Sequence, residues 1–258
     1  MTKIYYFSAT GNSLWTAKKI AAAIGESSQL YNIGTEINNN YKIIEADAVI
    51  FVYPSYGYGL PVVVHRFVEN VVFKTPYVAS LVTYGSSPRG TQGVMKRILR
   101  NKRVGKMFFA SIPAVENYLV LFGTPDEKTI EKRCGMQAKA TEEAIRSIIE
   151  RKVNSVNTFA PFSVFVSWLF SLGIKIFYKY YRIGNDCNGC SICEKVCPVG
   201  KIVMKDGRPV FFPGCEHCQA CVNLCPRRAI QFGRVKFGTP GYKHPEIDIN
   251  DLMSGRYL

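Results

Sequence analysis

In the first part of the chain, hydrophobic and polar positions alternate between a strand-like and a helix-like period. Apolar runs rich in β-branched and aromatic residues predict five strands, with helical spacing between them. The predicted strands are Lys3–Ser8, Gln29–Ile33, Asp47–Tyr53, Tyr77–Tyr84 and Lys106–Ile112. The predicted helices are Ser13–Ile24, Pro61–Asn70, Gly90–Asn101 and Asp126–Lys152. This alternation predicts an α/β domain with a doubly wound five-stranded parallel sheet, whose ligands bind at the carboxyl ends of the strands.

The pattern changes after these elements. Phe159–Ile174 contains no charged residue, and Lys175 and Lys179 follow it among aromatic residues. A membrane span needs about 20 apolar residues, whereas this run is shorter and is interrupted by serines. We expect a buried helix or arm that packs between domains. A helix that lies on a membrane surface or docks a partner is the less favoured alternative.

The nine cysteines are unevenly spread, because only Cys134 lies outside a repeated pattern near the C-terminus. Two units share the spacing C-x2-C-x2-C-x3-C-P, and in this arrangement the fourth cysteine of each unit ligates the other iron–sulfur cluster. The predicted ligand sets are Cys187, Cys190, Cys193 and Cys225 for one [4Fe-4S] cluster, and Cys215, Cys218, Cys221 and Cys197 for the second. Structural zinc normally uses two separated C-x2-C pairs, so zinc is the weaker interpretation. A disulfide framework conflicts with a reducing compartment. We expect Cys134 to be a buried or semi-buried small apolar residue.

Residues from about 184 to 237 resemble a bacterial-type dicluster ferredoxin, with all eight ligand positions matched. The resemblance implies a small α+β domain with two [4Fe-4S] clusters.

A second candidate site follows the first predicted strand. The loop Ser8-Ala9-Thr10-Gly11-Asn12-Ser13 leads directly into a helix. The backbone N–H groups and positive dipole end of a helix N-terminus suit a phosphate group, and Ser8, Thr10 and Ser13 add hydroxyl donors. The loop has neither the P-loop pattern of nucleotide triphosphatases nor the G-x-G-x-x-G pattern of NAD-binding domains. A polar turn that only caps the helix is the structural alternative.

This loop resembles the FMN-phosphate loop of flavodoxins, S/T-x-T-G-N-S/T. The resemblance implies that the loops after the third and fourth strands hold the flavin ring, with tyrosines as candidates for stacking. The implied FMN-binding residues are Ser8, Thr10, Gly11, Asn12, Ser13, Pro54, Ser55, Tyr56, Gly57, Tyr58, Gly59, Thr83, Tyr84, Gly85 and Gly90. Alternatively, the tyrosines are loop aromatics that pack on the domain. Glu116, Asn117 and Tyr118, after the fifth strand, are candidates to cover the flavin.

The whole chain resembles flavodoxin–ferredoxin fusion proteins, known mainly from anaerobes. The expected organisation is a flavodoxin-like FMN-binding domain at 1–154, an aromatic connecting arm at 155–182, a ferredoxin-like domain at 183–240 and a C-terminal tail at 241–258. The implied function is electron transfer between FMN, the two clusters and external redox partners. The alternative is an FMN-dependent reductase of a small acceptor, such as a quinone or nitro compound, for which no acid–base pair is evident.

The formal net charge of +14 refines the expected partners. A basic surface steers association with an acidic redox protein. A membrane-surface electron mediator is a third, less favoured function. Nucleic acid is not expected, because no binding motif accompanies the charge. The N-terminus has no secretory-signal pattern, and we therefore expect a cytoplasmic protein; the sequence predicts no oligomeric state.

Overall fold

The computed structural model describes residues 1–36, 42–157 and 161–253. Residues 37–41, 158–160 and 254–258 lie outside the described part. The first residues of the predicted charge-free run, Phe159 and Ala160, and the end of the predicted tail therefore fall outside it.

A five-stranded parallel sheet forms the centre of the larger, N-terminal part, in the order β2-β1-β4-β6-β7. Its strands are β1 (Thr2–Tyr6), β2 (Ser28–Asn32), β4 (Ala48–Pro54), β6 (Tyr77–Tyr84) and β7 (Lys106–Pro113). The chain order of these strands across the sheet is 2-1-3-4-5, which is the flavodoxin-like doubly wound topology. The fold class predicted from the sequence is confirmed, and the strand order reverses beside β1, where such sheets bind ligands.

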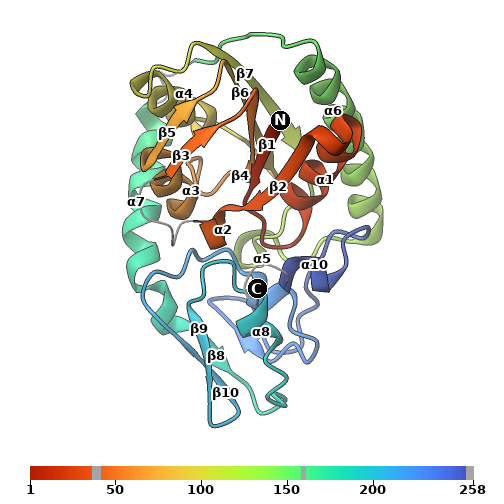
Figure 1. Cartoon of the computed structure of the whole chain (residues 1–258). Coiled ribbons are helices and arrows are strands. Elements are labelled where there is room, and N and C mark those ends of the chain that lie inside the picture. Colours follow the sequence, from red (N-terminus) through yellow and green to blue (C-terminus); the bar gives the residue numbers. More distant parts are fainter. Residues whose placement is uncertain (37–41, 158–160, 254–258) are drawn as a thin grey trace.

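Helices cover both faces of this sheet (Figure 1). The helices of this part are α1 (Asn12–Ile24), α2 (Ile33–Glu36), α3 (Val62–Glu69), α4 (Thr91–Asn101), α5 (Leu119–Phe122) and α6 (Glu127–Ile149), with a 3-10 turn η1 (Gly25–Ser27). The apolar alternation along β1 explains the two layers. Tyr5 and Phe7 pack in the core that includes α3 and α4, whereas Ile4 and Tyr6 pack in the core that includes α1 and α6.

Two short strands were not predicted from the sequence. β3 (Lys42–Glu45) and β5 (Val71–Lys74) pair in parallel with each other, outside the main sheet. Each strand has only four residues, and β5 begins one residue after the Asn70 that caps α3, so neither forms a separate apolar run.

The cysteine-rich part lies against the carboxyl ends of the parallel strands (Figure 1). Its elements are short: η2 (Tyr178–Tyr180), β8 (Arg182–Ile183), α8 (Ile192–Lys195), β9 (Ile202–Lys205), β10 (Arg208–Phe211), α9 (Ala220–Asn223), β11 (Ile230–Gln231) and α10 (Ile249–Met253). β9 pairs with β10 and β8 with β11, both antiparallel. The two parts meet closely, since a Cβ atom on Gly34 of α2 would lie 1.9 Å from the carbonyl oxygen of Pro198.

Helix α7 (Pro161–Phe177) joins the two parts and runs along the side that carries α3 and α4 (Figure 1). Its Phe170 and Phe177 contact His217 of the second cysteine unit. Among the described helices, none combines the length and the hydropathy that crossing a bilayer requires.

Candidate functional site

A cavity of about 280 Å³ lies between the carboxyl ends of β1, β4 and β6 and the second cysteine unit. It is lined by Ser8, Ala9, Thr10, Asn12, Ser13, Pro54, Ser55, Tyr56, Gly57, Tyr58, Thr83, Tyr84, Gly85, Ser86, Ser87, Ala114, Val115, Glu116, Asn117, Tyr118, Leu121, Phe122, Val166, Phe170, His217 and Cys218. None of these lining residues is a lysine or an arginine. Among the described residues, the lining therefore combines hydroxyl and aromatic side chains and contains no lysine or arginine.

Three of the predicted FMN-binding residues do not line this cavity, namely Gly11, Gly59 and Gly90. Gly11 and Gly90 are the N-cap residues of α1 and α4. Gly59 forms an isolated antiparallel β-bridge with Tyr56. The structure brings the other predicted FMN-binding residues together. They come from three segments far apart in the sequence, because the carboxyl ends of parallel strands share one edge of the sheet.

The first loop presents donors to the cavity. Helix α1 begins after Gly11, which has a φ of 104° and makes no side-chain capping bond, so the orphan N–H groups of the helix are not capped from within. The hydroxyls of Ser13 and Thr83 lie 2.8 Å apart, and the Asn117 amide donates to the Thr10 hydroxyl at 2.7 Å. The predicted Asn12 side chain is held differently: its amide nitrogen donates to the carbonyl of Val115 at 2.9 Å.

A segment near the C-terminus closes the back of this loop and was missed in the sequence. Tyr242 donates its hydroxyl to the Asn12 side-chain oxygen at 2.8 Å, and the backbone N–H of His244 donates to the carbonyl of Thr10 at 2.8 Å. His244 also stacks on Trp15 of α1, with ring centroids 5.1 Å apart. No motif or period marks this segment, so only the three-dimensional structure shows that it supports the loop.

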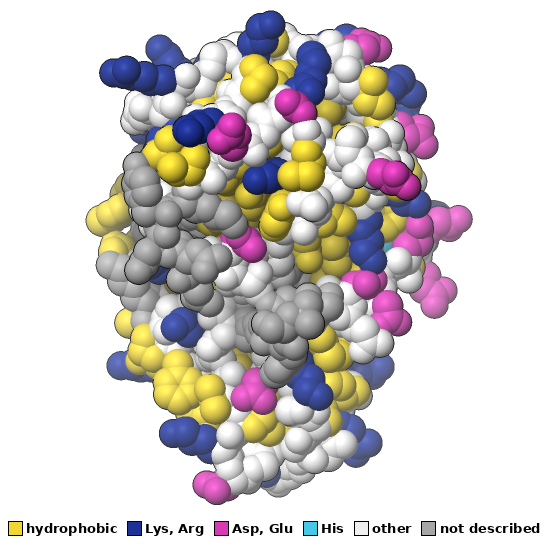
Figure 2. All heavy atoms as spheres, in the orientation of Figure 1, with side chains coloured by type: hydrophobic (Ala, Val, Ile, Leu, Met, Phe, Trp, Pro, Cys, Tyr) yellow, Lys and Arg dark blue, Asp and Glu magenta, His cyan; other side chains and the backbone are white. Residues whose placement is uncertain are grey.

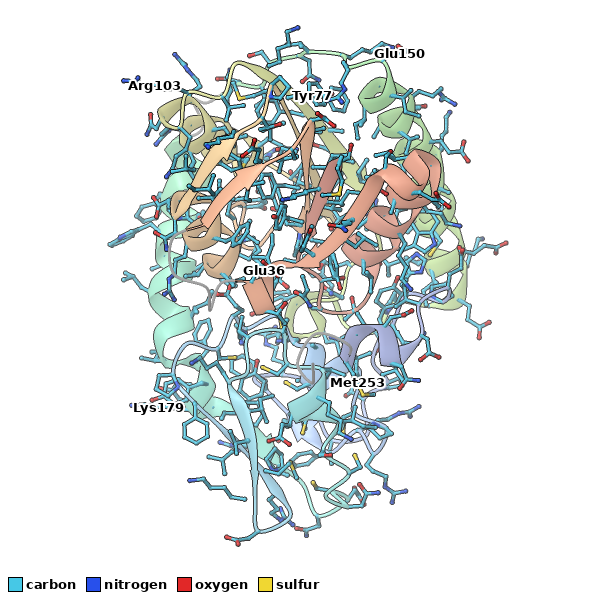
Figure 3. All side chains as sticks on the ribbon, in the orientation of Figure 1. Glu36, Tyr77, Arg103, Glu150, Lys179 and Met253 are labelled. Carbon is cyan, nitrogen blue, oxygen red and sulfur yellow. The ribbon has the colours of Figure 1, made fainter. Side chains whose placement is uncertain are left out.

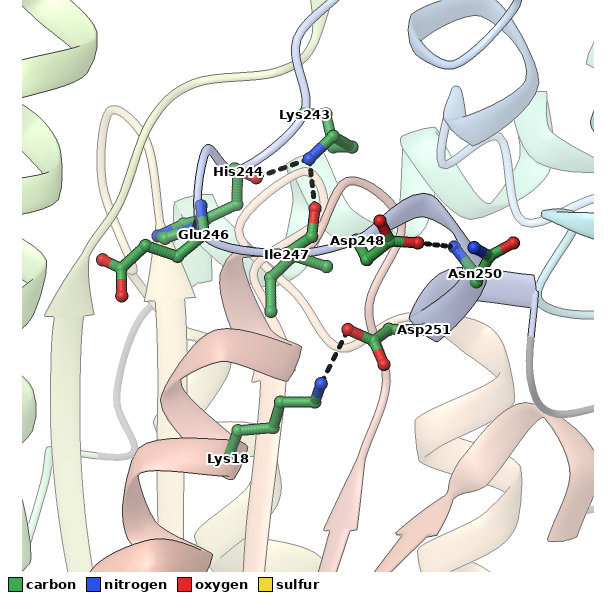
Figure 4. Close-up of polar contacts among 8 residues, drawn as sticks. All are labelled: Lys18, Lys243, His244, Glu246, Ile247, Asp248, Asn250 and Asp251. Carbon is green, nitrogen blue, oxygen red and sulfur yellow. Dashed lines mark hydrogen bonds and ion pairs between the residues drawn. The ribbon is translucent and has the colours of Figure 1, made fainter.

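Figure 4 shows how the same segment is held to α1. Lys243 donates to the carbonyls of His244 and Ile247, and Lys18 of α1 pairs with Asp251 of α10 at 2.7 Å. Burial lowers the pKa of His244 to about 4; Glu246 opposes this shift, while Lys243 and Lys19 add to it. His244 is therefore neutral near pH 7. We name residues 242–253 the C-terminal strap.

Tyr56 lines this cavity and carries a buried polar atom. Its side-chain hydroxyl is buried and has no hydrogen-bond partner among the described residues. Burial raises the pKa of Tyr56 well above its usual range, so the hydroxyl keeps its proton and can donate. A buried hydroxyl without a partner costs about 1–3 kcal/mol. The rings of Tyr56 and of Phe170 from α7 line the cavity and would offer aromatic surfaces to a flavin ring.

The second cysteine unit forms another wall. Cys218 and His217 both line the cavity. The ring nitrogens of His217 lie 3.1 Å from the Tyr118 hydroxyl and 3.0 Å from the Tyr181 hydroxyl. Burial lowers the pKa of His217 to about 4, so its neutral ring donates one of these bonds and accepts the other. His217 was not predicted as a site residue, because the cysteine spacing does not show what the intervening residues face.

Glu216 joins the second unit to the α/β domain. Its two carboxylate oxygens accept hydrogen bonds from the backbone N–H groups of Val62 and Val63 at 2.9 and 2.8 Å. These groups are orphan donors at the start of α3, and a carboxylate there is favoured by the helix dipole. Burial raises the pKa of Glu216 to about 7, although the two backbone hydrogen bonds oppose the shift.

The cysteines fall into two spatial groups that match the predicted ligand sets. A small cavity is lined by Cys187, Cys190, Cys193 and Cys225, which combines three cysteines of the first unit with the fourth of the second. The second group is identified by the effects of its cysteines on one another. Burial is the largest cause that raises the pKa of Cys218, and the nearby Cys197 and Cys215 raise it further. The pKa of Cys221 is raised by burial and then by Cys218, Cys215 and Cys197.

The surroundings of the thiols fit iron–sulfur clusters. Burial raises the pKa of Cys193 to about 12 and that of Cys215 to about 11, a penalty that bound cations remove. The buried amide of Gln219, between two cysteines of the second unit, has no partner among the described residues. The described residues contain no group of three or more His, Cys, Asp or Glu arranged around one metal ion. A cluster does not need such a group, because each thiolate binds a different iron.

Cys134 is partly buried, as predicted, 4.0 Å from the His244 ring.

Comparisons with known proteins give one family match and several similar solved structures. Residues 186–230 match the family model of the 4Fe-4S dicluster domain. Among solved structures, an azoreductase from Bacillus anthracis str. Sterne is 13% identical, covers 57% of this chain and 98% of its own, and has a TM-score of 0.39. A flavodoxin from Streptococcus pneumoniae TIGR4 is 14% identical, with coverages of 55% and 98% and a TM-score of 0.33. An NAD(P)H:quinone oxidoreductase from Methanothermobacter marburgensis is 10% identical, with coverages of 57% and 96% and a TM-score of 0.38. No curated protein matches the chain.

The strand order and the family match together define the class of the protein. The chain joins a doubly wound α/β part of flavodoxin-like strand order to a cysteine-rich part in which residues 186–230 match the 4Fe-4S dicluster domain, as the sequence predicted.

Proposed function

We propose that the chain is an electron carrier in which FMN and two [4Fe-4S] clusters exchange electrons within one molecule. One observation carries the proposal: Cys218, a predicted ligand of the second cluster, lines the same cavity as the hydroxyl-rich loop predicted to bind the FMN phosphate. No other domain separates the two sites. The cofactors supply the redox chemistry, one or two electrons for the flavin and one for each cluster.

The binding roles follow from the cavity. The uncapped N-terminus of α1 and the hydroxyls of Thr10 and Ser13 would hold a phosphate group without a basic side chain. The Tyr56 hydroxyl would donate to the flavin ring. FMN is favoured over a dinucleotide because the C-terminal strap closes the back of the loop, where His244 binds Thr10.

The two clusters have different surroundings, which suggests an order of transfer. The set with Cys218 adjoins the flavin cavity, and none of the cysteines in the other set lines that cavity. In the other set Cys190 is exposed. We therefore place the second cluster next to FMN and the first cluster where an external redox protein docks; the basic surface favours an acidic partner.

Anaerobic purification with iron and flavin analysis tests the cofactor content. Two clusters and one flavin correspond to about eight irons and about one FMN per chain. Rapid-mixing experiments then test the relay: after reduction of the clusters, flavin reduction should be fast and independent of protein concentration, because the cofactors share one chain. Slow transfer that accelerates with protein concentration would defeat the proposal.

A reductase of a small acceptor is the second candidate function. Leu121 and Phe122 of α5 are exposed and line the cavity, so they offer an apolar approach to a bound flavin. Turnover of a quinone or nitro compound without any protein partner would favour this candidate over the carrier.

A further inference from the structure

The outward face of α7 is a continuous apolar stripe. Phe165, Trp168, Leu169, Leu172 and Ile176 are 58, 56, 55, 40 and 48% exposed. Their spacing of three, four and seven residues places them on one side of the helix. Contiguous exposed apolar surface of this kind usually marks a binding face.

The opposite face of α7 is already occupied. Ile174 is buried, Phe177 contacts His217 and Phe232, and Phe170 lines the flavin cavity. The helix is therefore apolar on both sides, although only one side packs on the protein. An apolar helix of this type is stable when both sides are covered.

The chain segment that carries the stripe has charges of one sign. The chain has no acidic residue between Glu150 and Asp186, and Lys179 and Arg182 follow the helix with exposed side chains. Figure 3 places Lys179 at the lower end of α7. At the other end, Lys96 of α4 donates to the Val156 carbonyl, just before α7. In Figure 2 hydrophobic side chains project along the left edge, where α7 runs, whereas acidic side chains gather mainly toward α6.

These charges select among possible occupants. In a twofold dimer through this face, a basic flank of one copy would meet a basic flank of the second copy, because the interface is self-complementary and both ends of the stripe are basic. An anionic lipid surface satisfies both features: the apolar stripe enters the interface between headgroups and acyl chains, and the lysines and arginines meet lipid phosphates. Tryptophan and tyrosine, here Trp168 and Tyr180, are typical of this interface.

We propose that the outward face of α7, with its basic flanks, docks the protein on an anionic bilayer. Docking is peripheral, with α7 parallel to the membrane plane. The proposal is independent of the assigned redox function, because it rests on surface residues that bind no cofactor.

Vesicle binding by the anaerobically purified full chain tests the proposal. The protein should sediment with vesicles of phosphatidylcholine and phosphatidylglycerol, but not with phosphatidylcholine alone, and about 1 M salt should release it, since charges are then screened beyond about 3 Å. Trp15 is buried and Trp168 is exposed. A blue shift of tryptophan emission, and quenching by brominated lipids, should therefore report insertion at Trp168.

Two variants separate the contributions. Leu169→Asp combined with Leu172→Asp should abolish binding. Lys179→Gln combined with Arg182→Gln should weaken it about 25-fold, from about fivefold for each basic residue near an anionic surface. The matched control, Lys128→Gln with Lys132→Gln, removes the same charge from α6 on the opposite side of the molecule and should bind like the unchanged protein.

Three results would overturn the proposal. They are no binding of the unchanged chain to anionic vesicles, equal binding to neutral vesicles, and equal loss in the α6 control. A concentration-dependent dimer that is lost on Leu169→Asp, without vesicle binding, would assign the face to a second copy instead. A variant that has misfolded is recognised by its low iron and flavin contents. In that case, the binding of the unchanged protein to anionic and neutral vesicles still decides whether the proposal holds.

Discussion

The unpartnered hydroxyl of Tyr56 gives the sharpest test of the flavin cavity. We predict that Tyr56→Phe has opposite effects on the flavin-free and flavin-loaded protein. Without flavin, the hydroxyl is buried with no partner among the described residues. Its removal relieves a desolvation cost of about 1–3 kcal/mol. With flavin, the same substitution removes a hydrogen bond worth about 0.5–1.5 kcal/mol.

The two effects add in the binding equilibrium, because one stabilises the free protein and the other weakens the complex. Even about 1.4 kcal/mol in total raises the dissociation constant tenfold, so we expect FMN to bind at least about tenfold more weakly. The Tm of the flavin-free protein should rise by about 2–4 °C for each kcal/mol of relief. The assays are fluorescence titration with FMN and thermal unfolding, on protein with reconstituted clusters and depleted flavin.

Tyr77→Phe is the matched control. The Tyr77 hydroxyl donates to the Lys152 carbonyl at 3.0 Å, and Figure 3 places this tyrosine at the end of the sheet away from the cavity. Its loss should lower the Tm of both forms alike and leave FMN affinity unchanged. If Tyr56→Phe behaves like this control, the hydroxyl does not face a flavin and the cavity assignment is wrong.

Further predictions address the clusters, the contact between the two parts and the strap. Cys225→Ser should lower the iron content from about eight to about four, and flavin reduction by the remaining cluster should stay fast. Cys197→Ser should instead remove the cluster beside the flavin. The reverse pattern in rapid-mixing experiments would disprove the crossed ligands. Glu216→Ala leaves two N–H groups of α3 without a cap and should cost about 2 kcal/mol, seen as a lower urea midpoint, while an unchanged midpoint would contradict the capping role. Burial keeps His244 neutral with a pKa of about 4, below the ordinary value of 6.5, so its contribution is complete above about pH 6.5 and is lost as pH falls toward 4. His244→Gln should flatten this pH dependence of the unfolding free energy by about 1–2 kcal/mol, an allowance for partial solvent screening, and an equally steep profile would exclude His244 as its source.

The sequence was sufficient for the elements that are repetitive or locally encoded. The predicted strand Tyr77–Tyr84 has the bounds seen in the structure, because a continuous apolar run buried on both faces has no other stable location. The cysteine spacing predicted which cysteines lie together, including the exchange of Cys197 and Cys225, whereas their role as cluster ligands stays a prediction. A tight loop with fixed spacing leaves few alternative geometries.

Contacts between distant segments were not predictable in the same way. Tyr242 contacts Asn12 across most of the chain, and no local pattern encodes that contact. His217 lines the cavity from a loop that Glu216 attaches to α3, and the cysteine spacing does not encode that attachment. The predicted domain boundaries stay predictions, since Phe170 of the connecting arm lines the cavity together with residues of both neighbouring domains.

The C-terminal strap links the order of synthesis to cofactor loading. The loop around Thr10 is made first by the ribosome, but its support from Tyr242 and His244 arrives only after both cysteine units have emerged. The nascent α/β domain therefore lacks the back of this loop until the last residues of the chain have been synthesised. Under the proposed function, a flavin would gain its complete site only when the C-terminal strap has been synthesised and has packed behind the Thr10 loop.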